Sequence, residues 1–233
     1  DAEGNERPLK RAKLATDGPD TSSNTVGRFS KKKVAVMFGF LGANYQGFQR
    51  NPGAKTLEDA IERALYAAGG IMPSNYGDLK KIAWTRSART DKGVSAAACC
   101  VGMRLVMVRD DFEQMVKRIN LHMPPEIRVH SITPAVGGFD AKAQCSKRRY
   151  EYLLPTYALQ RRGSREQQLN DPSRKVDSAE LNRQLQSLRA VLAKFEGTHN
   201  FHNYTTSQVK ATDAQAKRYI LSFEASDPFV LDG

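Results

Sequence analysis

Residues 94–108 read Val-Ser-Ala-Ala-Ala-Cys-Cys-Val-Gly-Met-Arg-Leu-Val-Met-Val, an apolar run with one charged side chain, Arg104. A continuous apolar stretch of this kind, rich in Val and other strand formers, predicts a strand. The polar segment 86–93 stands directly before the run and predicts a loop that leads into the strand. The other expected elements lie before and after this long strand in the sequence.

Helices and further strands are expected on both sides of it. Residues 34–40 predict a strand, and Thr56 opens a helix in which Asp59 holds the capping-box position. Gly69 and Gly70 end that helix. Asp110 or Asp111 is expected to cap a further helix at 110–121. Another helix is expected at 178–195, and further strands at 82–84, 127–132, 139–144, 149–154 and 219–223. This order favours an α+β fold with a mixed, mostly antiparallel sheet and helices on one face.

The composition points to a polyanionic partner. The formal net charge of +11 favours nucleic acid, although a basic protein without such a partner has the same balance. A hydrophobic fraction of 40% allows a folded core, and no apolar run is long enough to span a membrane. The three cysteines lack the regular spacing of a disulfide framework, and the four histidines complete no metal-binding pattern. We therefore expect a metal-free protein from a reducing compartment.

The chain divides into three regions by composition. Residues 1–32 are rich in charged and small polar residues without apolar periodicity, which predicts a disordered basic tail. The basic cluster at 9–13 is typical of a nuclear import signal, an RNA-contacting arm or a solvated charge run. Residues 33–146 and 147–233 follow as an N-terminal and a C-terminal half. Strands precede helices on both sides of residue 150, so two similar halves are expected.

Residues 88–95 read Ala-Arg-Thr-Asp-Lys-Gly-Val-Ser and carry the strongest chemical signal. Asp91 stands between Arg89 and Lys92, and nearby cations favour the ionised form of a carboxyl group. An ionised carboxylate in a restricted site can act as a nucleophile or as a base. Asp-Lys-Gly is also a typical turn between strands, because Asp and Gly favour turns for backbone reasons. The sequence leaves both interpretations open.

Three further segments combine aromatic rings with polar groups. In residues 147–152, Tyr150 and Tyr152 would share one face of a strand. Aromatic rings beside cations can stack on bases while the cations hold phosphates, but the same tyrosines could pack in a core. Residues 195–204 and 44–50 are dense in groups that stack and form hydrogen bonds. Each of these segments could bind RNA or form a loop whose polar groups are satisfied internally.

Together these segments resemble the TruA family of tRNA pseudouridine synthases. Residues 88–96 are similar to the family's catalytic motif, and residues 145–157 to its tyrosine motif. Gly-Thr-His-Asn-Phe-His-Asn-Tyr-Thr at 197–205 is similar to the eukaryotic multisite nuclear branch, as are Arg-Tyr-Ile-Leu and Asp-Pro-Phe-Val within 218–230. The resemblance covers residues 33–233, and the ordered set of motifs is far more specific than any one motif alone.

The resemblance implies a reaction and several residue roles. Asp91 matches the family's essential aspartate, in an enzyme that breaks the N-glycosidic bond of uridine, turns the base and rejoins it through carbon 5, without cofactor or metal. Arg89 matches an arginine that fills the space of the flipped uridine, and Tyr150 a tyrosine that lies against the target base. Extruding a base costs free energy, which explains an inserted residue. Lys92 and His202 are further candidate substrate-binding residues.

The expected partner is tRNA, with small nuclear RNA and mRNA as further options, bound in a cleft between two similar halves by shape and charge. The branch implies a nuclear location, with the mitochondrion as an alternative. A monomer that does not bind membranes is the simplest expectation.

One departure from the family separates two interpretations. The family has a further strand and helix after Asp-Pro-Phe-Val, including an arginine that pairs with the catalytic aspartate, whereas this sequence ends at Gly233. We therefore expect a catalytic N-terminal half at 33–146, carrying the Asp91 loop, and a truncated C-terminal half at 147–233. The chain is then either an active tRNA pseudouridine synthase or an RNA-binding module that is inactive for lack of the C-terminal segment.

Overall fold

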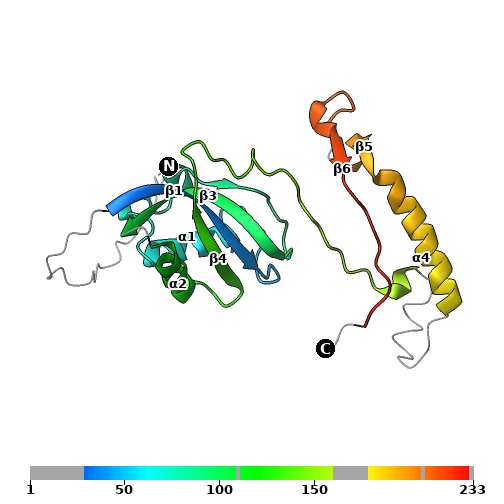
Figure 1. Cartoon of the computed structure of the whole chain (residues 1–233), viewed down its shortest axis with the longest axis horizontal. Helices are drawn as coiled ribbons and strands as arrows, with labels where there is room; N and C mark the ends of the chain where they lie inside the picture. Colours follow the sequence, from blue (N-terminus) through cyan, green and yellow to red (C-terminus); the bar gives the residue numbers. More distant parts are fainter. Residues whose placement is uncertain (1–28, 109–110, 160–177, 206–207, 231–233) are drawn as a thin grey trace, which may run out of the picture. The chain divides into compact units, whose positions relative to one another are not determined.

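The computed structural model describes residues 29–108, 111–159, 178–205 and 208–230. These residues form two compact units, with the boundary between Arg148 and Arg149 (Figure 1). Most of the predicted tail, residues 1–28, lies outside the described residues. Similarity between two halves and a cleft between them stay predictions, because each unit is described by itself.

The first unit is built on a four-stranded sheet. Its elements are β1 (Phe29–Phe40), α1 (Leu57–Ala67), the 3-10 helices η1 (Pro73–Asn75) and η2 (Leu79–Ile82), β2 (Thr85–Arg86), β3 (Ala96–Val108), α2 (Phe112–His122) and β4 (Ile127–Pro134). The strand order is β2-β3-β1-β4, and every neighbouring pair is antiparallel. The predicted α+β class with a mostly antiparallel sheet is therefore confirmed.

Strand β1 begins earlier than the sequence predicted. Phe29 pairs with Val108, and the pairing with β3 continues through Lys32. Residues 29–32 therefore belong to the sheet, and the prediction that the tail extends to residue 32 is wrong for these residues. The long β3 provides backbone partners for them, and this pairing outweighs the polar character of their side chains.

Both predicted helix caps of the first unit are confirmed. The side chain of Thr56 accepts a hydrogen bond from the Asp59 amide at the start of α1, and Asp111 accepts one from the Gln114 amide at the start of α2. Such caps satisfy backbone amides that have no partner within the helix. Both helices therefore start where the sequence indicates.

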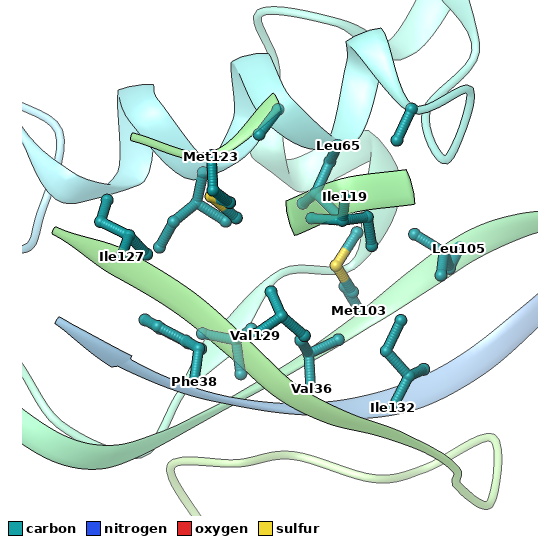
Figure 2. Packing of buried hydrophobic residues seen from close by; sticks show 14 of the residues in the cluster. Val36, Phe38, Leu65, Met103, Leu105, Ile119, Met123, Ile127, Val129 and Ile132 are labelled. Atoms are coloured by element: carbon teal, nitrogen blue, oxygen red, sulfur yellow. The ribbon is translucent and has the colours of Figure 1, made fainter. Parts of the chain in front are cut away.

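The core lies between one face of the sheet and the two helices (Figure 2). The buried cluster combines residues of β1, α1, β3, α2 and β4, including Val36, Phe38, Leu65, Met103, Leu105, Ile119, Met123, Ile127, Val129 and Ile132. Because residues of α1 and α2 join the same cluster, both helices cover the same face of the sheet. Burial of this apolar surface is the main stabilising contribution to the unit.

Three predicted strands are absent from the described structure. Ile82 ends η2, and Ala83 is left-handed with φ of 50°, so residues 82–84 form a turn whose Ala83 carbonyl accepts a hydrogen bond from Lys33 Nζ. Residues 139–144 also turn, because the Asp140 side chain accepts hydrogen bonds from the Lys142 and Ala143 amides. Residues 149–154 have no regular structure.

The second unit holds one long helix and a small sheet. Its elements are η3 (Thr156–Leu159), α4 (Ser178–Leu192), η4 (Ala193–Phe195), β5 (Gly197–Asn200), η5 (His202–Tyr204), η6 (Ala214–Ala216) and β6 (Lys217–Ile220). The predicted helix at 178–195 is confirmed as α4 and η4, and the last strand lies slightly before its predicted position. β5 and β6 pair with each other in antiparallel fashion. None of the helices described in either unit has the length and apolar character needed to cross a membrane.

Helix α2 offers a test of the core. Ile119 is fully buried, whereas Leu121, two residues further along, is 81% exposed. We expect Ile119→Ala to lower the free energy of unfolding by about 2–5 kcal/mol, because it leaves a cavity among packed side chains. The measurement is urea denaturation followed by the fluorescence of Trp84, the single tryptophan of the chain, which packs against this core.

Leu121→Ala is the matched control for this measurement. It removes the same number of carbon atoms from the same helix but opens no cavity, so its effect should stay within about 0.5 kcal/mol. Equal effects of the two substitutions would contradict the described packing of α2.

Candidate active site

Asp91 begins a tight turn just before β3. The Val94 amide donates to the Asp91 carbonyl at 3.3 Å, and Gly93, inside the turn, has φ of 79°. This left-handed conformation favours glycine. The side chains of Arg89, Asp91 and Lys92 are all exposed. The turn predicted from Asp-Lys-Gly is thus confirmed, and it presents the carboxylate to solvent between two exposed cations.

A second loop forms backbone hydrogen bonds with this turn. We call residues 42–48, which follow β1, the clamp loop. The Phe48 amide donates to the Thr90 carbonyl at 3.0 Å, and the Gly93 amide donates to the carbonyl of Tyr45 at 3.3 Å. The turn around Asp91 is therefore fixed by backbone hydrogen bonds on both sides of the carboxylate.

Two glycines of the clamp loop lie very close to the backbone of the turn. The Gly42 amide donates to the Ser95 hydroxyl oxygen at 3.0 Å. A Cβ on Gly42 would lie 1.9 Å from the Val94 carbonyl oxygen, and a Cβ on Gly47 would lie 3.2 Å from the Thr90 carbonyl oxygen. Gly47 also has φ of 110°. A side chain on Gly42 would push the two backbones apart, and the positive φ of Gly47 is one that other residues rarely adopt.

Two aromatic side chains anchor the clamp loop in the core. Tyr45 and Phe48 are 2% and 0% exposed, and the Phe48 ring stacks on that of Phe38 from β1 with 5.9 Å between centroids. Of the two interpretations of residues 44–50, the structure favours the internally satisfied loop for these aromatic rings. Sequence reasoning missed the clamp, and its only local signal was the pair of glycines flanking buried aromatic residues.

The start of the segment that carries Asp91 is tied to the sheet. The Ser87 amide donates to the Cys100 carbonyl at 2.9 Å, and the Cys100 amide donates to the Ser87 hydroxyl oxygen at 3.1 Å. The Arg148 guanidinium donates to the Ser87 carbonyl. Residues on both sides of Asp91 are therefore held, while the carboxylate itself makes no ion pair within the described part of the chain.

Two cysteines of β3, Cys99 and Cys100, lie close to this segment. Cys99 is buried and Cys100 half-buried, and burial raises the pKa of both thiols above the usual value. A raised pKa keeps a thiol protonated at neutral pH, which makes it a poor nucleophile. Among the described residues, no group of three or more His, Cys, Asp and Glu side chains lies close enough to hold a metal ion.

The remaining predicted site residues belong to the second unit. Tyr150 and Tyr152 are 82% and 85% exposed, so packing in a core, one of the two interpretations of these tyrosines, is not what the structure shows. His202 is half-buried, and Asn200 Oδ1 accepts from its backbone amide and lies 3.1 Å from its Nδ1. Arg89, Asp91 and Lys92 thus lie on one exposed segment of the first unit, and the structure does not relate that segment to Tyr150 or His202.

The clamp gives a direct test of the site's architecture. We expect Gly42→Ala to displace residues 91–95, because the new methyl group would overlap the Val94 carbonyl. Hydrogen exchange measured by mass spectrometry should then be faster in peptides covering Gly93 and Val94. Gly137→Ala is the control, because a Cβ there has no neighbour within 4 Å. Unchanged exchange in Gly42→Ala would show that the contact with Val94 does not exist.

Comparison with known proteins adds to this geometry. No family model matches the chain. The chain is 37% identical to the mouse protein named pseudouridylate synthase 1 homolog, over 99% of the chain and 51% of that protein. It is 39% identical to the human protein of the same name, over 86% of the chain and 45% of that protein. It is 44% identical to tRNA pseudouridine synthase 1 of Saccharomyces cerevisiae, over 57% of the chain and 24% of that protein.

The chain therefore spans about half the length of the mouse and human relatives it matches. The match to the mouse protein extends over both units described above, including the turn at Asp91 and its clamp. The same sequence also carries the ordered motifs that resemble TruA enzymes. The chain belongs to the TruA family of pseudouridine synthases, among relatives named pseudouridylate synthase 1 and tRNA pseudouridine synthase 1.

Proposed function

We propose that this chain carries the catalytic part of a tRNA pseudouridine synthase that isomerises uridine to pseudouridine in RNA. The observation that carries the proposal is the exposed carboxylate of Asp91 on a turn that the clamp loop holds at 3.0 Å and 3.3 Å. The curated relatives named tRNA pseudouridine synthase 1 supply the reaction class. An exposed acid on a rigid backbone is what a reaction on an extruded nucleoside needs.

Asp91 is the proposed catalytic carboxylate. In the isomerisation, the bond between C1′ and N1 of the uridine breaks and a bond between C1′ and C5 forms. C5 loses its proton to solvent and N1 gains one, so the product has the composition of the substrate. An ionised carboxylate beside the ribose can act by attack at C1′ or as a base on the sugar.

The neighbouring residues receive roles in substrate binding. We assign Arg89 to the space vacated by the flipped uridine and Tyr150 to stacking on the target base. Both side chains are exposed, Tyr150 by 82%, and aromatic rings stack on unpaired bases in many RNA-binding proteins. Lys92 and His202 are the remaining proposed contacts, Lys92 to phosphate and His202 to the RNA near the target.

The proposed partner is tRNA, with small nuclear RNA and mRNA as further substrates. The net charge of +11 supports binding to the phosphate backbone, which carries no sequence information by itself. A monomer located in the nucleus, with the mitochondrion as a second site, completes the proposal. The basic cluster at residues 9–13 supports the nuclear location.

The role of Asp91 is tested with tRNA that carries tritium at carbon 5 of uridine. Isomerisation releases this label, so the parent chain should release tritium. Asp91→Ala and Asp91→Asn should release none while binding tRNA as tightly as the parent, because the substituted side chain is exposed and supports no packing. Product analysis should show pseudouridine without free uracil.

Glu113→Gln provides the matched control, since it neutralises an exposed acid on α2 in the same unit. It should release tritium at the parental rate. Equal release by the parent and both Asp91 variants would remove Asp91 from its assigned role. Tight binding without release by the parent would instead favour an RNA-binding module that does not turn over.

The role of Tyr150 is tested by separating its ring from its hydroxyl group. Tyr150→Phe keeps the stacking surface and should bind tRNA like the parent. Tyr150→Ala should lose about 1–3 kcal/mol of binding free energy, the usual contribution of one stacked base. Filter binding at fixed salt measures both. Tyr152→Ala is the control, because Tyr152 is just as exposed, at 85%, and equal losses at the two positions would argue against a specific stack.

A further inference from the structure

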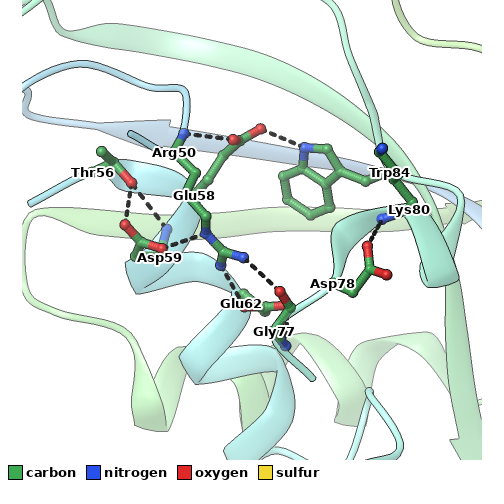
Figure 3. Close-up of polar contacts among 9 residues, drawn as sticks. All are labelled: Arg50, Thr56, Glu58, Asp59, Glu62, Gly77, Asp78, Lys80 and Trp84. Carbon is green, nitrogen blue, oxygen red and sulfur yellow. Dashed lines mark hydrogen bonds and ion pairs between the residues drawn. The ribbon is translucent and has the colours of Figure 1, made fainter. Parts of the chain in front are cut away.

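A buried carboxylate contacts two segments that are connected to the turn carrying Asp91. Glu58, in the first turn of α1, is 1% exposed. Its Oε2 accepts from the Arg50 amide at 2.8 Å, and its Oε1 accepts from the Trp84 indole Nε1 at 2.7 Å (Figure 3). Arg86 Nε lies 2.9 Å from the same Oε1. Both carboxylate oxygens are therefore occupied by groups from two segments far apart in the sequence.

These partners explain how a charge is tolerated at this depth. A buried carboxylate is costly unless it is paired and hydrogen-bonded, and the N-terminus of a helix further favours a negative charge. Such a pair seldom adds much net stability over apolar packing, but removing one partner leaves an uncompensated charge. The ion pair also compensates the charge of Arg86, whose Nη1 is buried with no hydrogen-bond partner among the described residues.

The first route from Glu58 to Asp91 runs through the clamp loop. The carbonyl oxygens of Gly47 and Phe48 accept from the Leu57 and Glu58 amides at 3.2 Å and 3.1 Å. The Phe48 amide in turn holds the Thr90 carbonyl at 3.0 Å. The Glu58 side chain fixes Arg50, just beyond the clamp loop, so the same residue holds this loop by its backbone and by its carboxylate.

The second route runs along the segment that leads to Asp91. Trp84 and Arg86 lie at β2, directly before the connection that contains the catalytic turn, and Arg86 pairs with Val101 of β3. Glu58 holds both side chains through one oxygen. One buried carboxylate thus joins the loop that clamps the turn and the strand from which the turn departs.

We propose that Glu58 is a positioning residue that sets the place of the Asp91 carboxylate by fixing both of these segments. The proposal rests on the proposed function for its effect on rate, but its structural effect can be measured without any reaction. Glu58 touches neither substrate nor reacting atoms in this scheme and acts only through the backbone of residues 88–95.

Helix α1 also supplies a matched control. Glu62, one turn further along, is 2% exposed, ion-paired with Arg50 and hydrogen-bonded to the Gly77 amide at 3.0 Å. No contact of its side chain with residues 84–95 is found in the described structure. Glu62→Gln therefore removes an equally buried charge from the same helix while leaving the Trp84 and Arg86 contacts in place.

The experiment compares Glu58→Gln with Glu62→Gln in the full chain. An amide offers one oxygen where three donors meet a carboxylate, so Glu58→Gln must release one of the two segments. We expect faster hydrogen exchange in peptides covering residues 88–95 of Glu58→Gln and parental exchange there in Glu62→Gln. With tritiated tRNA, Glu58→Gln should show kcat lowered by up to about 100-fold, the loss that a misplacement of about 1 Å can cause, with unchanged tRNA affinity.

Equal changes in exchange and in kcat for the two variants would overturn the proposal, because they would reflect a general loss of stability. If Glu58→Gln fails to fold, Trp84→Phe removes one donor and keeps an aromatic ring, and it should give a smaller increase in exchange over residues 88–95. Parental exchange in Trp84→Phe would then refute the proposal. Absence of tritium release from the parent would count against the proposed function alone, since the exchange result stands without it.

Discussion

The hydrogen bond from the Phe48 amide to the Thr90 carbonyl, with the close approach of Gly42 to Val94, is the constraint on which the site depends. It joins two loops backbone to backbone, so this contact with the Asp91 turn needs no side chain of its own. Phe48 itself is fully buried. The position of the proposed catalytic group therefore depends on the hydrophobic core, and a change that loosens the packing around Phe48 should also displace Asp91.

The sheet topology makes this contact possible. β1 and β3 are antiparallel, and their last pair is Phe40 with Ala96. The residues that follow β1 must therefore meet the residues that precede β3, which are the clamp loop and the Asp91 turn. The approach is already tight inside the sheet, where a Cβ on Gly39 would lie 2.7 Å from the Ala97 carbonyl oxygen. Antiparallel pairing of β1 and β3 thus places both loops at the same end of the strand pair, and glycines allow their backbones to come into close contact.

Local signals predicted the parts of this fold that local interactions decide. Caps such as Thr56 and Asp111 fixed the helix starts, because their side chains bond amides three residues away. Prediction failed where tertiary contacts decide. Residues 82–84 look like an apolar strand, yet Ile82 is buried at the end of a 3-10 helix and Ala83 turns the chain.

The candidate site divides in the same way. Asp91, Arg89 and Lys92 are close in sequence, so their grouping could be predicted. The clamp loop at 42–48 instead contacts residues 90–95, which are far from it in sequence. Glu58 gave no sequence signal at all, because its burial depends on Trp84 and Arg86 reaching it across the fold. The relation of Asp91 to Tyr150 and His202 is likewise a matter of tertiary arrangement, which the spacing of motifs does not contain.

The first unit contains buried carboxylates that hold its structure and an exposed carboxylate that is proposed to react. Glu58 and Glu62 are buried, and each is neutralised by an arginine, Arg86 and Arg50 respectively. Asp91 is exposed, and its nearest cations in sequence, Arg89 and Lys92, are exposed as well. A carboxylate that holds structure must be paired, because burial makes an unpaired charge costly. A carboxylate that reacts must keep its oxygens accessible, so its position has to come from the backbone that carries it.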